Sequence, residues 1–514
     1  MKNLKILLFV VVASLFAACD DAIDIIQPSE LLPQDTFETV GDLSLGLNGV
    51  YGLIPGEDHI IFTSIFTDEV KIGYANGGQG KDGGLAFLLN ANSGDADAIW
   101  ASNYRLINAA TRLIEGAKNV NPVDEENGID QSEEYSNIIA QARALRAYGH
   151  FQLLTFFSEN LKDDNALGVI ALDFVPTIQQ QLPRNTNGEV FALIDSDLAF
   201  AQENLQLTTS GNKSSLRDYV STDFVKALKA RMAAYRGQYN VAEQLADELI
   251  VSYGLTGKYA QGQSHNLDLS NRDQLLVRSN YYKLFRDGAF TPGNTNEVIF
   301  KAGRAATPND ATGNFYQAWS SVNTSITGSP FFEVSAALYN QLLPDDIRRT
   351  VIIDPTAYPS FSIRPVGKYS ESETVFFLAD LKIFRSSEMV LIKAEARANA
   401  NDFAGVAEQI NIIRDARFGN EAGQTNGHIA VPGSAQEAWA AILDERRIEL
   451  AFEGFRYIDI KRLGTLAGKG IDRAPSDCAF NGACNLELND HRWTLPIPRR
   501  ELSGNANIQQ NSGY

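Results

Sequence analysis

The sequence contains few of the residues that most often carry catalysis or bind metals. Its 514 residues include 3 cysteines, 3 methionines, 4 tryptophans and 5 histidines. The histidines follow no HExxH pair, and the acidic residues nowhere show the spacing of a calcium loop. No GxSxG is present, so a serine hydrolase of the common elbow type has no support. We therefore expect no metal and no cofactor; the scattered histidines are His59, His150, His265, His428 and His491.

Basic residues are too few for a chain that binds nucleic acid. Lys and Arg total 44 against 63 Asp and Glu, which gives a net charge of -19. A phosphate backbone would meet repulsion from this charge instead of counterion release. Hydrophobic residues make up 44% of the chain and aromatic residues 10%. This composition is typical of a globular protein with a large core and excludes a disordered chain.

Long apolar runs are absent except for one at the start of the chain. The run from Ile6 to Ala18 follows Lys2 and Lys5 and ends in small residues. It is too short for a membrane-spanning helix, which needs roughly twenty residues, so we interpret it as an export signal. The segment LFAAC resembles a bacterial lipoprotein signal, whose cysteine is diacylated. We expect a signal peptide over 1–18, lipidation of Cys19, and an anchor and tether over 19–40; the alternative is a plain secretory signal.

The two remaining cysteines, Cys478 and Cys484, lie close together in a stretch with Gly and Asn. In an exported protein such a pair predicts a local disulfide that pins a loop. A zinc site has less support, because no histidine lies within zinc-finger spacing and His491 is the nearest. A pair of free thiols is the remaining alternative.

Apolar residues recur at helical spacing over much of the chain, including 100–120, 135–157 and 190–205. Two segments, 221–253 and 386–417, are each interpreted as two amphipathic helices joined by a short turn. They resemble tetratricopeptide hairpins, which bury one face only against neighbouring pairs. The pattern predicts a mainly α protein with hairpins near 100–157, 221–253 and 386–417.

The stretch from about Gly254 to Tyr369 is rich in Asn, Ser, Gly, Thr, Pro and aromatic residues. Continuous helix is not expected there, and long loops in a compact protein are usually functional. Within it, Tyr281, Tyr282 and Phe285 are interpreted as core residues.

A glycine-rich segment, GGQGKDGG over 77–84, satisfies the GxGxxG pattern at Gly78, Gly80 and Gly83. The dinucleotide fingerprint also needs a preceding strand, a helix that opens at it and a repeating strand-helix chain. This helix-dominated sequence offers none of them. We expect a flexible loop.

Three glutamates, Glu445, Glu449 and Glu453, fall on one helical face. Their spacing makes them candidates for the paired acids of a glycosidase. Nothing marks one of them as the desolvated proton donor that this chemistry needs. The same spacing suits ion pairs within the segment, so we expect pairing and no enzyme activity. The expected partners are Arg446, Arg447 and Arg456.

One long segment carries a family resemblance. ILDERRIELAFEGFRYIDIKRLG, from Ile442 to Gly464, is similar to the most recognisable part of the SusD/RagB family of outer-membrane nutrient-uptake lipoproteins. The end of the chain, WTLPIPRRELSGNANIQQNSGY, resembles the C-terminal signature of that family. LSLGLNGVYGLI, AQARALRAYGHFQLLTFF, PRNTNGEVFALIDSDL and AEARANANDFAGVAEQINIIRDARFG look like further family segments in the right order. The resemblance covers essentially the whole mature chain.

The resemblance implies a SusD-like fold, in which four tetratricopeptide-like hairpins pack against a loop-rich half within one domain over 41–514. It also implies a lipoprotein on the cell exterior that caps a SusC-like TonB-dependent transporter in the outer membrane. Such proteins capture oligosaccharides or, in some members, peptides, and they bind without cutting. The pair Asp20 and Asp21 looks like a surface-export signal of these lipoproteins.

A sugar site needs exposed aromatic rings beside polar groups, because a pyranose stacks its apolar face on a ring while its hydroxyls form hydrogen bonds. Two segments supply this combination. The predicted ligand residues are Asp68, Tyr74 and Asn76 in one, and Phe315, Tyr316 and Trp319 in the other. For the last three, core packing is an equal alternative.

Other aromatic residues are assigned to the core. Trp100 and Trp439 sit on helical patterns, and Ile448, Phe452 and Phe455 recur at helical spacing in the family-like segment. The sequence does not separate a glycan binder from a peptide binder, and it names neither a sugar nor a linkage. An exported glycoside hydrolase is a further alternative.

Overall fold

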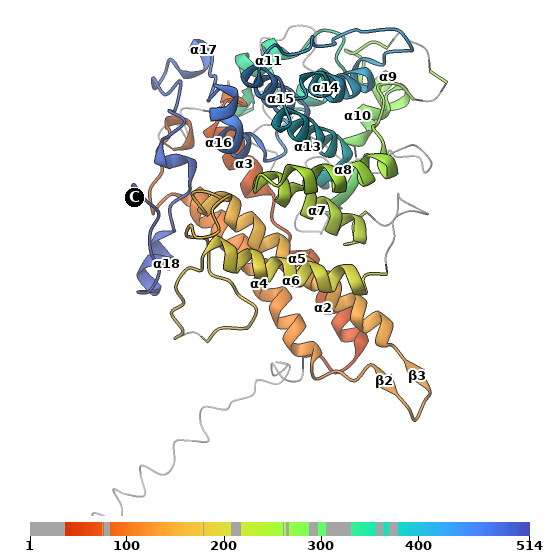
Figure 1. Cartoon of the computed structure of the whole chain (residues 1–514), viewed down its shortest axis with the longest axis vertical. Helices are drawn as coiled ribbons and strands as arrows, with labels where there is room; N and C mark the ends of the chain where they lie inside the picture. The colour runs from red at the N-terminus through yellow and green to blue at the C-terminus, as the bar shows by residue number, and fades with distance from the viewer. Residues whose placement is uncertain are drawn as a thin grey trace, which may run out of the picture.

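The computed structural model of the chain describes residues 36–73, 76, 83–177, 179–206, 217–260, 262–263, 267–286, 297–304, 330–355, 363–369 and 379–514. Within them, helices dominate (Figure 1). Cys19, Tyr74, Phe315, Tyr316 and Trp319 lie outside the described residues, as do Gly78 and Gly80.

Five helices form the N-terminal part of the described chain: α2 (Val40–Tyr51), α3 (Glu57–Phe66), α4 (Gly94–Ala117), α5 (Ser132–Phe157) and α6 (Asn187–Asn204). The middle part has six: α7 (Thr222–Tyr235), α8 (Tyr239–Tyr253), α9 (Arg272–Arg278), α10 (Asn280–Leu284), α11 (Ala336–Gln341) and α12 (Arg349–Ile352). The C-terminal part has α13 (Ser386–Asn399), α14 (Phe403–Phe418), α15 (Ala435–Glu449), α16 (Arg456–Ala467), α17 (Pro475–Cys478) and α18 (Arg499–Gly504). Two 3-10 turns are η2 (Gly84–Ala86) and η6 (His491–Trp493).

Short polar residues start and separate the helices of the hairpins. Ser221 accepts a hydrogen bond from the backbone of α7, and Gly237, at φ +75°, turns the chain into α8. Asn401, at φ +58°, lies in the turn after α13. The side chain of Asp402 then caps α14 by accepting a hydrogen bond from the backbone N–H of Gly405. The two turns expected in 221–253 and 386–417 therefore have a local chemical cause.

The hairpins pack on one another across long sequence distances. Helix α8 packs against α13, and α13 also contacts α14 and α15, while α4, α5 and α6 lie side by side in the other half of the view (Figure 1). Helix α15 packs against α16. Each hairpin thereby covers the apolar face of a neighbour, which is the arrangement that makes such pairs stable.

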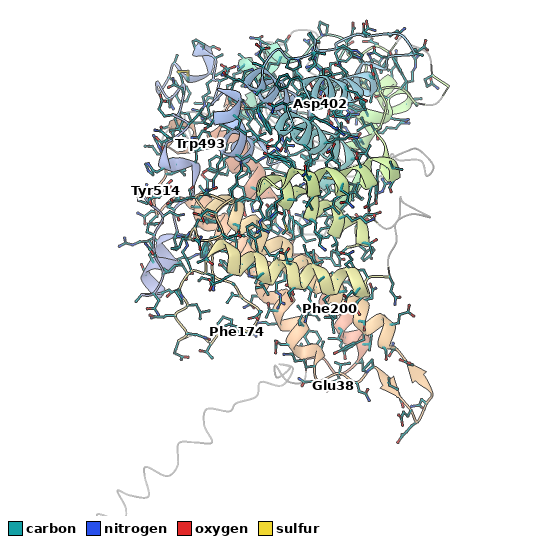
Figure 2. All side chains as sticks on the ribbon, viewed as in Figure 1. Glu38, Phe174, Phe200, Asp402, Trp493 and Tyr514 are labelled. Atoms are coloured by element: carbon teal, nitrogen blue, oxygen red, sulfur yellow. A yellow bond between two sulfur atoms is a disulfide. The ribbon has the colours of Figure 1, made fainter. Side chains whose placement is uncertain are left out.

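A cluster of aromatic rings joins the two ends of the chain. The ring of Tyr457 on α16 contacts Phe62 and Phe66 on α3 at centroid distances of 5.0 and 5.5 Å. It also meets Phe156 at the end of α5 and Trp493, which is labelled in Figure 2. Burying rings of this size stabilises the fold strongly, so α3 and the C-terminal helices belong to one core.

The predicted core residues are confirmed by their burial. Tyr281, Tyr282 and Phe285 are fully buried, and Trp100 and Trp439 are 3% and 5% exposed. Ile448, Phe452 and Phe455 are also buried.

The expectation of one continuous helical face through residues 445–455 is wrong. Helix α15 ends at Glu449 and α16 begins at Arg456, and the turn between them holds Phe452 at φ +60° and Gly454 at φ +86°. A left-handed backbone cannot continue a right-handed helix. Ile448, Phe452 and Phe455 are nevertheless all buried, in two hydrophobic clusters.

The strands form three antiparallel pairs: β1 (Val70–Ile72) with β5 (Phe332–Val334), β2 (Val123–Asp124) with β3 (Ile129–Asp130), and β4 (Val298–Ala302) with β6 (Leu381–Arg385). In the first pair, Ile72 stands opposite Phe332. Among the described residues, no helix is both long and apolar enough to span a bilayer.

The C-terminal segment is held by one arginine. Arg184 donates to the carbonyl of Phe157 at 3.0 Å, to that of Gln509 at 3.1 Å and to the side chain of Asn511 at 2.8 Å. Tyr514 donates its hydroxyl to the carbonyl of Thr494 at 2.9 Å. These hydrogen bonds hold the family-like C-terminal segment against the rest of the fold.

Candidate functional site

The predicted ligand segments join the described chain at one place, which we call the strand corner: Gly73, Asn76, Pro330, Phe331 and the paired strands β1 and β5. Because the pair is antiparallel, the end of β1 lies beside the start of β5. The N–H of Gly73 extends the ladder by donating to Phe331 O at 2.7 Å. The residues that follow β1 and those that precede β5 thus leave from the same edge.

Only glycine fits at the end of β1. A Cβ on Gly73 would lie 2.1 Å from the carbonyl oxygen of Pro330 and 2.7 Å from the carbonyl carbon of Phe331. Backbone atoms cannot move aside as a flexible side chain can, so a larger residue would separate the two strands.

Asn76 fastens the corner. Its side-chain N–H donates to the carbonyl of Phe331 at 3.1 Å, and the residue is 1% exposed. The Oδ1 atom of Asn76 is buried and has no hydrogen-bond partner in the described chain. The amide N–H of Asn76 thus has a supporting role at the corner, and a contact between Asn76 and ligand stays a prediction.

Asp68 is not placed in a ligand site, which corrects the prediction. Its side chain is fully buried and accepts hydrogen bonds from the guanidinium of Arg456 at 2.8 Å and from the backbone of Asp472 at 2.7 Å. Burial opposes ionisation, but Arg447 and Arg456 outweigh it and hold the pKa of Asp68 well below its usual range. The sequence offered no means of seeing these distant arginines.

Glu69 lies beside Asp68 in a different electrostatic environment. Burial raises the pKa of Glu69 to about 7, although its carboxylate accepts hydrogen bonds from Ser64 Oγ at 2.7 Å and from the N–H of Phe452 at 3.0 Å. The pKa values of these two adjacent buried carboxyls are therefore shifted in opposite directions. Arginine lowers the pKa of Asp68, and burial raises that of Glu69.

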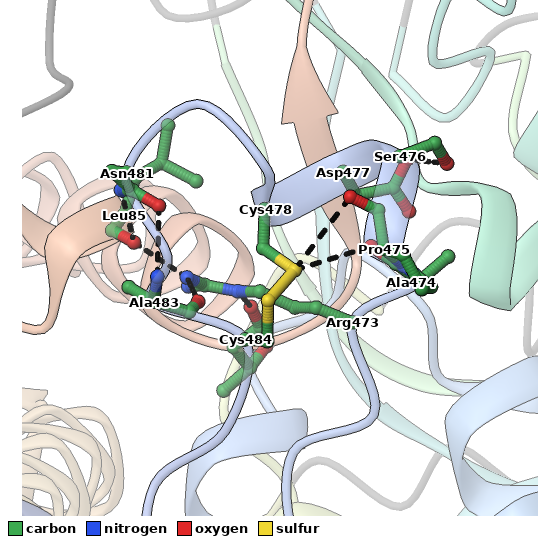
Figure 3. The surroundings of a disulfide bond; sticks show 11 residues. Leu85, Arg473, Ala474, Pro475, Ser476, Asp477, Cys478, Asn481, Ala483 and Cys484 are labelled. Carbon is green, nitrogen blue, oxygen red and sulfur yellow. Dashed lines mark hydrogen bonds between the residues drawn. A yellow bond between two sulfur atoms is a disulfide. The ribbon is translucent and has the colours of Figure 1, made fainter.

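The disulfide loop, residues 478–484, borders the strand corner. Cys478 and Cys484 are joined by a disulfide (Figure 3) with their Cα atoms 5.1 Å apart. Helix α17, which ends at Cys478, packs against β1, and Asp477 accepts a hydrogen bond from the N–H of Ala336, just beyond β5, at 2.8 Å. Asn481 donates to the carbonyl of Leu85 at 3.2 Å (Figure 3). The loop thus connects both strands to η2.

Arg473 holds this loop through hydrogen bonds to backbone carbonyls. Its guanidinium donates to the carbonyls of Thr67 and Ala483, both at 2.7 Å, and also to that of Leu85. One aromatic side chain of the loop, Phe480, is 40% exposed. Sequence analysis missed Phe480, although an aromatic residue between two cysteines of a small loop was a usable indication of an exposed ring.

The three glutamates of the family-like segment are ion-paired, but not to the expected arginines. Glu445 pairs with Arg348 at 2.6 Å, Glu449 with Arg417 at 2.7 Å and Glu453 with Lys368 at 2.6 Å. The expected partners point elsewhere: Arg446 to Asp459 and Glu395, and Arg447 and Arg456 to Asp68.

Against the effect of burial, neighbouring cations hold the pKa of Glu449 well below its usual value, chiefly Arg417 and Arg385. The pKa of Glu453 is lowered as well, by Arg385 and Lys368. A glycosidase acid needs the opposite shift, so neither carboxyl is set up as a proton donor.

A groove of about 420 Å³ lies between α4 and α18, away from α17 in Figure 1. Trp100 and Tyr104 contribute to its wall. The Tyr104 hydroxyl is already used, since it donates to the carbonyl of Ile170 at 3.0 Å and accepts from its N–H at 2.9 Å. We take the strand corner as the candidate site, because it holds Gly73 and Pro330, the described residues next to the predicted aromatic segments in the sequence.

The comparisons with known sequences agree on one family. The model of the SusD family matches residues 366–514. SusD-like protein P2 of Formosa agariphila is 25% identical over 568 residues, covering 100% of both chains. SusD-like protein P38 of the same organism is 22% identical and covers 100% of this chain and 99% of its own.

The solved structures share the fold. A putative sugar binding protein from Bacteroides vulgatus is 22% identical with a TM-score of 0.69, covering 93% of this chain and 99% of its own. A SusD superfamily protein from Bacteroides thetaiotaomicron is 21% identical with the same TM-score of 0.69, covering 92% and 99%. The prediction of a mainly α, SusD-like fold is confirmed. Because the SusD family model matches residues 366–514 and two SusD-like proteins align over the full length, the chain is similar to the SusD family.

Proposed function

We propose that this protein is a lipid-anchored receptor of the outer cell surface that binds oligosaccharides and passes them to a partner SusC-like TonB-dependent transporter. The similarity to the SusD family supports this class of function, a receptor that binds carbohydrate. Two of the structures with this fold are described as sugar or carbohydrate binding proteins of Bacteroides vulgatus, the second with a TM-score of 0.66.

The observation that carries the proposal is the antiparallel pairing of β1 with β5. It places Gly73, which precedes Tyr74 in the sequence, beside Phe331, which follows the segment with Phe315, Tyr316 and Trp319. Exposed Phe480 stands on the disulfide loop that borders the strand corner. Aromatic rings among polar residues are what a pyranose needs for stacking and for hydrogen bonds. We assign the ligand contacts to these residues.

We propose that lipid on Cys19 holds the protein at the outer membrane and that residues 41–514 act as a single domain. Glu38, near the start of the described chain, is exposed and lies far from α17 in the views (Figures 1 and 2), which suits a tether that leaves the fold there. The ion pair between Asp68 and Arg456 supports one domain, since it links the two ends of the chain.

The ion-paired carboxylates at the end of α15 and in the turn after it support binding without hydrolysis. Glu449 and Glu453 are held ionised by arginine and lysine, while a glycosidase needs one carboxyl that stays protonated. A peptide-capturing receptor of the same family is the second candidate, since its recognition would use the same exposed loops.

Native affinity electrophoresis tests the proposal. The soluble form that starts just after Cys19 is run in gels cast with neutral and acidic polysaccharides, and reducing ends are assayed in parallel. We expect retardation by one glycan without new reducing ends. Trp319→Ala and Tyr316→Ala should weaken this retardation more than tenfold at unchanged melting temperature, whereas Phe174→Ala, which removes a ring 38% exposed elsewhere, should not.

Each other outcome overturns part of the proposal. Release of reducing ends would indicate an exported hydrolase. Binding of peptides with no glycan retarded would favour the peptide receptor. Lost stability in the Trp319 and Tyr316 variants, with affinity unchanged, would assign these residues to the core.

A further inference from the structure

A pocket of about 160 Å³ opens at the C-terminal end of α5, between α7 and α16. It is separate from the strand corner and shares no residue with it. Since a water molecule takes up about 30 Å³ of liquid, the pocket has room for a few water molecules or one small molecule. Its charged and polar lining is Thr155, Glu159, Lys162, Tyr235, Lys461 and Arg462, with Asn160 at the rim.

Three cationic side chains converge on this pocket in a protein whose net charge is -19. Lys162 comes from the loop after α5, and Lys461 and Arg462 are neighbours on α16. Glu159 is the one acidic residue of the lining. The lining thus carries more cationic than acidic side chains, and its two lysines favour an anion within the pocket.

The arginine is already neutralised, but the lysines are not. Arg462 binds Glu395 through two hydrogen bonds, one of them at 2.6 Å, and Asp459 at 2.9 Å. Within the described chain, Lys162 and Lys461 form no ion pair. The ammonium of Lys461 donates instead to the carbonyls of Thr155 at 3.1 Å and Ser158 at 2.7 Å.

Burial disfavours the charged form of Lys461, and the hydrogen bonds to these carbonyls do not offset this effect. It lowers the pKa of Lys461 to about 7, and Glu159 opposes this only in part. A desolvated ammonium without a carboxylate partner gains more from a nearby anion than a hydrated one does. Burial also lowers the pKa of Lys162, where the charge of Arg462 adds to the effect.

Tyr235 supplies an independent observation. It lines the pocket, is 5% exposed, and its hydroxyl has no hydrogen-bond partner among the described residues. The Arg462 guanidinium lies over its ring at 4.6 Å from the centroid. The hydroxyl is therefore available as a hydrogen-bond donor to a group that enters the pocket.

We propose that this pocket binds one small oxyanion, a carboxylate, sulfate or phosphate group, with Lys162, Lys461 and the Tyr235 hydroxyl as its donors. Oxyanions accept several short, charge-assisted hydrogen bonds at once. The two ammonium groups and the hydroxyl that line this small pocket can supply such bonds. The proposal is independent of the glycan function, because it uses none of the residues of the strand corner.

Titration calorimetry on the soluble protein tests the proposal, with sodium sulfate, phosphate and glucuronate as probes at constant ionic strength set by sodium chloride. At least one probe should bind with a stoichiometry of one, and the strongest identifies the type of oxyanion. Lys162→Ala and Tyr235→Phe should each weaken that binding at least tenfold. Lys469→Ala removes a lysine of the same region that pairs with Asp444 outside the pocket, and should leave binding unchanged.

Thermal melting gives a second readout, since an anion that binds only the folded state raises the melting temperature with its concentration. Lys162 is exposed, so its removal should not prevent folding. The proposal is overturned if no probe binds, or if sulfate, phosphate and glucuronate act equally on the folded Lys162→Ala, Tyr235→Phe and unmodified proteins.

Discussion

Asp68, two residues before β1, and Arg456, the first residue of α16, lie 388 positions apart in the sequence and share two hydrogen bonds of 2.8 Å. The backbone N–H of Asp472 adds a third to the same carboxylate. This pair fixes the start of β1 against the C-terminal helices. Since β1 carries one side of the strand corner, the position of the candidate site depends on an ion pair in the interior.

Asp68→Asn should destabilise the protein by about 3–5 kcal/mol, because it leaves Arg456 and Arg447 buried without their counterion. Urea unfolding followed by circular dichroism measures the change. Asp444→Asn breaks the solvent-accessible pair with Lys469 and should cost about 1 kcal/mol or less. Equal effects of the two substitutions would show that Asp68 has no special role in the interior.

Glu69 should make the protein less stable as the pH rises. Its pKa is about 7 in the folded protein and 4.5 in its ordinary state, so between these values the folded state holds more of the proton. Stability therefore decreases with increasing pH across this window. Glu69→Gln, which cannot ionise, should remove the decrease.

The comparison should use the difference between Glu69→Gln and the unmodified protein at pH 5, 6, 7 and 8. Two buried histidines act in the opposite direction, since burial lowers the pKa of His59 and His150 to about 3 and their contribution grows as pH rises. They are common to both proteins and cancel in the difference. A difference that stays constant over pH 5–8 would rule out a raised pKa at Glu69.

Local patterns predicted the helices well and the ion pairs poorly. The hairpins of 221–253 and 386–417 follow from apolar spacing and from cap and turn residues such as Ser221 and Asp402, all of which act within a few positions. The partners of Glu449 lie at Arg385 and Arg417, brought close only by the packing of hairpins. Spacing of three or four residues suits pairs within a helix equally well, so it could not distinguish them.

The candidate site shows the same division. Aromatic and polar composition indicated which segments to watch, and the pairing of β1 with β5 places Gly73 beside Phe331, two described residues that flank them. Composition could not show that Asp68 and Asn76 face inward, because exposure is set by residues hundreds of positions away. Phe480 was missed since its exposure depends on how the disulfide loop packs on η2.

Gly73→Ala should separate β1 from β5 and weaken glycan binding more than tenfold. The added Cβ meets the backbone of Pro330 and Phe331, and relieving such overpacking costs about 1–3 kcal/mol. Affinity electrophoresis and thermal melting measure the two effects. Gly49→Ala is the matched control: nothing lies within 4 Å of its Cβ position on α2, so it should stabilise the helix by up to about 1 kcal/mol.

Removing the disulfide should leave the protein folded. Closure of so small a loop stabilises by about 2 kcal/mol, and the loop is also held by Arg473 and Asn481. We expect the double variant Cys478→Ala, Cys484→Ala to melt at a lower temperature with an unchanged far-ultraviolet circular dichroism spectrum. Global unfolding of this variant at room temperature would mean that the disulfide supports more than its own loop.

Phe480→Ala should weaken glycan binding while the fold remains intact. The ring is 40% exposed, and a sugar stacked on its exposed face would lose most of its apolar contact with the protein. Phe174→Ala removes a ring of similar exposure, 38%, from a loop after α5 and serves as the control. Affinity gels of both variants in the retarding glycan decide the matter. Because the two substitutions are chemically identical and similarly exposed, a loss of retardation in Phe480→Ala alone places the ligand at the disulfide loop, and equal retardation of both excludes this ring from the site.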